Sequence, residues 1–113
     1  MEQVRAVARF VPMSPRKVRL VVDAVRGLNA EAALAVLRFM PKAAAVPVYK
    51  VIRSAIGNAE EKGLNRNDLV VSAIWADEGP RRQWRRFGAR GRFKPILRRS
   101  SHITVVLTEQ MED

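Results

Sequence analysis

The sequence contains no cysteine, only one histidine and no long uninterrupted run of apolar residues. Without cysteine the chain forms no disulfide and offers no thiolate to a metal or a substrate. No apolar stretch approaches the length that crosses a bilayer, and the first ten residues lack the apolar block of a signal peptide. We therefore expect a cytoplasmic protein with no membrane partner, no metal and no cofactor.

The single histidine, His102, follows Ser100 and Ser101 and so raises the question of a Ser–His catalytic pair. Successive side chains of an extended strand point to opposite faces, so Ser101 is poorly placed to use His102 as a base. A histidine that holds a loop or contacts a phosphate is the favoured interpretation. Asp77 and Glu78 diverge in the same way and favour a structural salt bridge. The chain is expected not to be an enzyme.

Acidic residues are absent between Gly79 and Thr108, although the whole chain carries 11 of them. This segment holds nine of the 21 basic residues, so most of the net charge of +10 is concentrated there. Such a density of like charge repels itself and becomes favourable beside a polyanion, whose condensed counterions are released. The nine basic residues are Arg81, Arg82, Arg85, Arg86, Arg90, Arg92, Lys94, Arg98 and Arg99.

Proline, glycine and asparagine divide the apolar pattern into predicted helices. Ser14 is placed to cap the first helix, Gly27 to end it, and Asn29 to cap the second. Pro47 lies inside the third, where it predicts either a kink near 43–47 or a later start. The expected helices span 15–26, 30–40 and 41–62.

Three segments, 4–11, 69–76 and 102–107, have the composition of β-strands. In the first, alternation places Phe10 on the apolar face. Both faces of 69–76 are mostly apolar, which predicts a central strand with Trp75 in the core.

The segment 79–99 is far longer than an ordinary hairpin loop, and its glycines and Pro95 disfavour a helix. Folded as two extended arms it would reach roughly 30 Å. We therefore expect a single domain over 1–113, with a compact body (1–78 plus 100–113) and a protruding basic β-hairpin (79–99). The apolar helix stripes are needed for one core, so no homo-oligomer is expected.

Arginines interleaved with aromatic residues favour irregular RNA, whose bases can be stacked and whose backbone can be followed by charge. No predicted helix has the row of polar side chains with which a sequence-specific DNA-binding protein contacts base edges. Two alternatives stay open: a DNA-architectural protein with a basic β-arm, and a membrane-active or chaperone-like basic protein. On the first helix, Arg16, Arg19 and Arg26 are expected to face solvent.

Four motifs occur in order along the chain: SPRKVRLVVDAVRG, SAIGNAE, ADEGP and RGR…ILRRSSHITVVL. Together they resemble the L twenty-two family of bacterial large-subunit ribosomal proteins. The resemblance implies an α+β fold, with a three-stranded antiparallel sheet packed on three helices and a long β-hairpin. It also implies a structural role in subunit assembly, with large-subunit rRNA, neighbouring ribosomal proteins and the nascent polypeptide as partners. In that family the hairpin lines the nascent-peptide exit tunnel.

The resemblance and the basic pattern together give two sets of candidate residues. The chain departs from the family where Phe87-Gly88-Ala89 replaces the usual Pro-Arg-Ala, and at Pro47. Tunnel-lining residues are expected to be Gln83, Trp84, Phe87, Gly88, Ala89 and Gly91. Residues expected to bind rRNA are Arg16, Lys17, Arg19, Arg81, Arg82, Arg85, Arg86, Arg90, Arg92, Lys94, Arg98, Arg99 and His102.

Overall fold

The computed structural model describes residues 2–79, 82–87 and 93–110, with the backbone alone for 82–87 and 93–98. Its elements follow one another as strand, three helices, a short 3-10 turn and four strands. They are β1 (Gln3–Val11), α1 (Pro15–Val25), α2 (Ala30–Arg38), α3 (Ala45–Glu61), η1 (Arg66–Asp68), β2 (Leu69–Glu78), β3 (Arg82–Phe87), β4 (Phe93–Arg98) and β5 (Ser101–Glu109).

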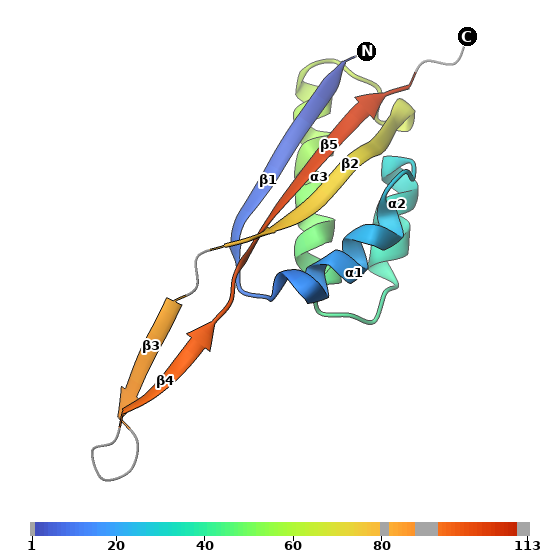
Figure 1. The fold of residues 1–113 in the computed structure, drawn as a ribbon. Helices are drawn as coiled ribbons and strands as arrows, with labels where there is room; N and C mark the ends of the chain where they lie inside the picture. The colour runs from blue at the N-terminus through green and yellow to red at the C-terminus, as the bar shows by residue number, and fades with distance from the viewer. Residues whose placement is uncertain (1, 80–81, 88–92, 111–113) are drawn as a thin grey trace.

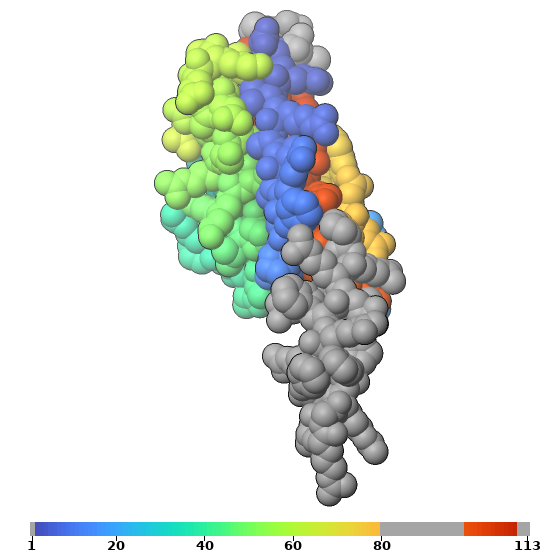
Figure 2. All heavy atoms as spheres, turned by 90° about the vertical axis from the view of Figure 1, so that its left-hand side faces the viewer, coloured from blue at the N-terminus to red at the C-terminus, as the bar shows by residue number. Residues whose placement is uncertain are grey.

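Three strands form one antiparallel sheet in the order β1-β5-β2, and the helices pack against one of its faces (Figure 1). Figure 2 shows β1 between α3 on one side and β5 on the other. A separate two-stranded ladder, β3–β4, extends beyond the end of this sheet. The arrangement confirms the predicted α+β fold. The expectation that 69–76 is the central strand was wrong, because β5 lies between β1 and β2.

The core lies between the sheet and the helices. The valines predicted to form the apolar stripe of α1, Val18, Val21, Val22 and Val25, are fully buried. Each such side chain stabilises the fold by roughly 1.5–3 kcal/mol relative to an exposed one. On the sheet side, β5 contributes the fully buried Ile103, Val105 and Leu107.

The helix boundaries follow the predicted signals with two refinements. Asn29 caps α2 by accepting a 3.0 Å hydrogen bond from the N–H of Glu31, and Gly27 follows α1 with φ +85°. Ser14 was predicted to cap with its side chain, but its backbone carbonyl accepts instead, from Lys17 and Val18. The third helix starts late, at Ala45, which places Pro47 in the first turn, where no N–H is required.

A bulge near the end of β1 overturns the predicted position of Phe10. The register with β5 shifts between Ala8 and Val11, and Phe10 adopts φ +57°. Its side chain is 55% exposed instead of packing on the apolar face. Simple alternation fails here because the bulge inserts a residue and turns the following side chain over.

A second irregularity, between Val71 and Ala73 of β2, changes which face of the strand is buried. Before it Leu69 and Val71 point into the core, and after it Ile74 and Ala76 do. Trp75, predicted to be a core residue, is therefore half-buried on the face away from the helices. Its indole Nε1 donates a 3.0 Å hydrogen bond to Asp77, and the guanidinium of Arg5 lies 5.9 Å from its ring centroid.

Candidate nucleic-acid interface

The β3–β4 ladder places basic residues opposite one another. In its antiparallel register Arg82 pairs with Arg98, and Arg86 pairs with Lys94. Like charges directly opposite across two strands are destabilising. Anionic phosphates placed beside these positions would remove that repulsion. The ladder is therefore suited to bind a polyanion.

The root of the hairpin, by which we mean Gly79 and Ser100, is a close backbone contact. The N–H of Gly79 donates a 2.8 Å hydrogen bond to the carbonyl of Ser100. A Cβ added at Gly79 would overlap the Ser100 hydroxyl and come within 3.3 Å of the Ser100 backbone. A side chain at position 79 would require the Ser100 hydroxyl to rotate or the two arms to separate, so glycine is the residue that fits this approach without a shift.

His102 and Ser101 secure the root from opposite sides of β5. The Ser101 hydroxyl, which is fully buried, donates a 2.6 Å hydrogen bond to the carbonyl of Met13. His102 Nδ1 accepts a 3.0 Å hydrogen bond from the N–H of Phe10, and the two rings meet edge to face at 4.9 Å. With Nδ1 as the acceptor, the neutral ring carries its proton on Nε2, which remains a donor. The two side chains do not form a catalytic pair, as expected.

Arg19 of α1 and Arg26, which directly follows this helix, form hydrogen bonds with the neighbouring strand β2. Arg19 donates from Nε and Nη2 to the carbonyl of Ala76, at 3.2 and 3.1 Å. Arg26 donates to the carbonyl of Ile74 at 2.9 Å and also pairs with Asp23. These carbonyls belong to the outer edge of β2. Both arginines therefore cover an open sheet edge. They are exposed, as expected, but their guanidinium groups also bind the backbone of β2.

Arg16 and Lys17, at the start of α1, are exposed, and their side chains form no hydrogen bond or ion pair within the described residues. Arg99 is also exposed, next to the root. Six of the predicted site residues lie outside the described residues, and those on β3 and β4 are placed by backbone register alone. The six are Arg81, Gly88, Ala89, Arg90, Gly91 and Arg92.

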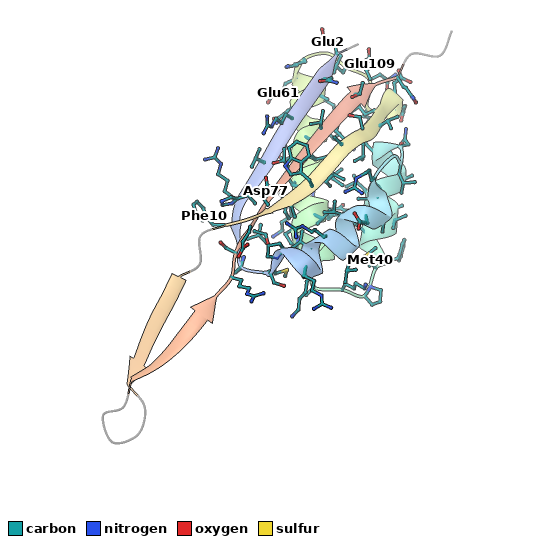
Figure 3. All side chains as sticks on the ribbon, in the orientation of Figure 1. Glu2, Phe10, Met40, Glu61, Asp77 and Glu109 are labelled. Carbon is teal, nitrogen blue, oxygen red and sulfur yellow. The ribbon has the colours of Figure 1, made fainter. Side chains whose placement is uncertain are left out.

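Charge is also divided along the body. Two long stretches, 3–22 and 32–59, contain no acidic residue, and they include the β1–α1 and α2–α3 connections. Both connections lie at the end of the body from which β3 and β4 extend (Figure 1). Glu2, Glu61 and Glu109 lie at the opposite end, whereas Asp77, near the end of β2, lies toward the hairpin (Figure 3). This division identifies the exposed Lys42, which no sequence motif singled out although the acid-free stretches are visible in the sequence.

The part of the chain that the structure describes contains neither a cluster of metal-ligand side chains nor a membrane-spanning helix. No group of three or more His, Asp or Glu side chains gathers there in a way that could hold a metal ion. None of the helices described is long and apolar enough to cross a bilayer.

Comparison with known proteins gives the family. The profile described as "Ribosomal protein L22p/L17e" matches residues 6–108. A "Large ribosomal subunit protein uL22" from Desulfatibacillum aliphaticivorans is 50% identical over 107 residues, covering 95% of this chain and 99% of the relative. The protein of the same name from Desulfitobacterium hafniense is 49% identical over 113 residues, covering 99% of both chains. A third, from Synechococcus, is 50% identical over 106 residues, covering 93% of this chain and 86% of the relative.

These relatives are ribosomal proteins and not enzymes, which confirms two expectations: the family resemblance and the absence of catalytic function. The match begins within β1 and ends within β5, and so includes the hairpin segment. On this match and these identities, the chain belongs to the ribosomal protein family L22p/L17e.

Proposed function

We propose that this protein is a structural component of the large ribosomal subunit, which binds large-subunit rRNA and supports subunit assembly. Its relatives carry the name of large-subunit proteins, and bacterial ribosomes lie in the cytoplasm. The proposal extends to residues 79–99 as a separable arm that lines the nascent-peptide exit tunnel. Its partners are then rRNA, neighbouring ribosomal proteins and the nascent polypeptide, without self-association.

The observation that carries the proposal is the separation of charge from core. The segment 79–108 holds nine basic and no acidic residues, and the β3–β4 register puts cations opposite cations. Self-repulsion of this kind is removed by a polyanion, which also gains entropy as its counterions are released. An arm of this length in a folded chain is therefore explained by a nucleic-acid partner.

Different parts of the chain have different proposed roles. Arg98 and Arg99 adjoin the rigid strand β5, so they are suited to anchor rRNA at the root. Arg16 and Lys17 extend the same surface onto α1, and His102 offers Nε2–H to a phosphate. The remaining basic residues of the arm follow the RNA backbone inward. Gln83, Trp84 and the tip residues 87–91 are proposed to line the tunnel.

The decisive experiment removes the arm. Residues Arg81–Arg99 are replaced by a short Gly-containing turn that joins Pro80 to Ser100, and binding to large-subunit rRNA is measured over a range of salt concentrations. We expect a folded protein whose log-log salt slope falls by about 0.7–0.9 for each phosphate that the protein no longer neutralises. A truncated protein with the parent's slope would contradict the proposal.

A second variant, matched to the deletion, keeps the arm but removes its charge. All nine Lys and Arg of 79–99 are changed to Gln. This variant should lose the same salt-dependent affinity, because charge and not length is responsible. Duplex DNA of equal length serves as the competitor. If the parent prefers the DNA over the rRNA at equal salt, the protein is architectural for DNA and the ribosomal proposal fails.

A further inference from the structure

A surface hollow of about 400 Å³ opens between the β1–α1 connection and the α2–α3 connection. Its volume lies in the range of small-ligand sites. The two connections that flank it lie at the hairpin end of the body (Figure 1), and Lys17 of α1 is one of its lining residues. Six residues line it: Met13, Lys17, Leu20, Lys42, Ala43 and Ala44.

The floor and walls of the hollow are apolar. Met13 packs against the core from one side, and Ala44 is 6% exposed at the base. Leu20 is 60% exposed and lies one helical turn from Lys17, so the two side chains are neighbours on α1. Leu20 therefore adds apolar surface to the lining of the hollow.

The rim of the hollow is cationic. Neither Lys17 nor Lys42 forms a side-chain hydrogen bond or ion pair within the described part of the chain, and no acidic residue lines the hollow. The backbone of the α2–α3 connection is held in place, since the N–H of Lys42 donates to Met40 at 2.9 Å and its carbonyl accepts from Ala45 at 3.1 Å. Two cationic side chains beside an apolar floor complement a ligand with an anionic edge and a flat apolar body.

We propose that this hollow binds one unstacked nucleotide of an RNA loop or bulge. The base and ribose cover Leu20 and Met13, and the flanking phosphates lie against Lys17 and Lys42. Bases in a duplex are stacked and cannot enter a hollow, whereas unpaired bases can be splayed out. The inference rests on the proposed rRNA binding and adds to it a second site, on the body and separate from the hairpin.

The probes are a single-stranded RNA hexanucleotide, an RNA duplex and inorganic pyrophosphate. Each is titrated into the full-length protein carrying labelled Met, Leu and Ala methyl groups. We expect the single strand to shift the NMR signals of Met13, Leu20, Ala43 and Ala44 together. The duplex should leave these four unshifted, and pyrophosphate should shift only Leu20 and Ala43, the labelled residues next to Lys17 and Lys42.

Three substitutions separate the parts of the site. Leu20→Gln should lower the affinity for the single strand about fivefold, as measured at the methyl groups of Met13, Ala43 and Ala44, and leave pyrophosphate binding unchanged. Lys42→Gln should weaken both ligands and reduce the salt slope by about 0.7. The control Lys62→Gln removes the same charge from an exposed position beside Glu60 and Glu61, and should change neither.

The site is rejected if Leu20→Gln binds the single strand as the parent does, or if the duplex shifts the same methyl groups equally. It is also rejected if poly-glutamate produces these shifts at lower concentration than RNA, since the occupant is then an acidic protein segment. If arm removal lowers rRNA affinity while Leu20→Gln has no effect, only the nucleotide site fails. If neither change lowers rRNA affinity, the proposed function fails as well.

Discussion

The N–H of Phe10 donates a 3.0 Å hydrogen bond to Nδ1 of His102, a residue 92 positions later in the chain. Phe10 has φ +57°, a backbone conformation that few non-glycine residues adopt. The histidine acceptor and its edge-to-face contact hold this conformation at the point where β1 passes the root of the hairpin. One side chain therefore couples the strand that precedes α1 to the strand that carries the arm.

Replacing His102 tests this coupling. His102→Phe keeps an aromatic ring and removes the acceptor, so we expect the free energy of unfolding in urea to fall by about 1 kcal/mol. The control Phe10→Leu keeps the N–H and removes the ring contact, at a cost of about 0.5–1.5 kcal/mol. An unchanged midpoint for His102→Phe would show that the hydrogen bond contributes nothing to stability.

Gly79→Ala tests the close approach at the root. The new Cβ overlaps the Ser100 hydroxyl and crowds its backbone, so the arms must separate or the hydroxyl must rotate. We expect a loss of about 1–3 kcal/mol in thermal or urea unfolding. Gly57→Ala is the matched control: this position in α3 has open space, and the change should stabilise by about 0.5–1 kcal/mol. Equal effects of the two substitutions would contradict the steric argument.

The arginines that cover β2 give a prediction for hydrogen exchange. Arg26→Met removes the bonds to Ile74 and Asp23 and keeps the aliphatic stem, so stability should fall by about 1–2 kcal/mol. Amide exchange along β2 should accelerate more than along β1. Arg53→Met, at an exposed position without a side-chain partner among the described residues, should have little effect. Uniform acceleration of exchange over the whole sheet would contradict a stabilising effect of Arg26 that is confined to β2.

The proposed division of labour within the arm predicts two different phenotypes. Arg98→Glu with Arg99→Glu puts repulsive charge at the rRNA anchor and should impair incorporation into subunits, seen in sucrose gradients. Trp84→Ala should assemble near normally and change nascent-chain stalling or macrolide sensitivity. Equal assembly defects in the two variants would refute the division.

Helix positions were largely predictable because they depend on local chemistry. The valine stripe of α1, the Asn29 cap and the stop at Gly27 all follow from residues within one or two turns of each other. Pro47 was ambiguous in the sequence, since a kink and a late start satisfy its geometry equally. The structure has the late start, at Ala45.

Strand faces were less predictable because alternation assumes an unbroken register. The irregularities at Ala8–Val11 and Val71–Ala73 reversed the expected positions of Phe10 and Trp75. Strand order was also misjudged, since two strands, 69–76 and 102–107, are apolar on both faces. Composition alone does not say which of them lies in the centre, where both edges must pair with other strands.

The sequence by itself predicted a polyanionic partner and identified the family, because nine basic residues without an acid in 79–108 and four motifs in order are properties of the chain. It also determined most helix boundaries. Only the tertiary structure decided which cations remain available. Arg19 and Arg26 bind β2 carbonyls, whereas Lys17 and Lys42, 25 positions apart, meet at one hollow. Such pairings depend on how distant segments of the chain pack together. A local sequence pattern does not show which distant residues become neighbours.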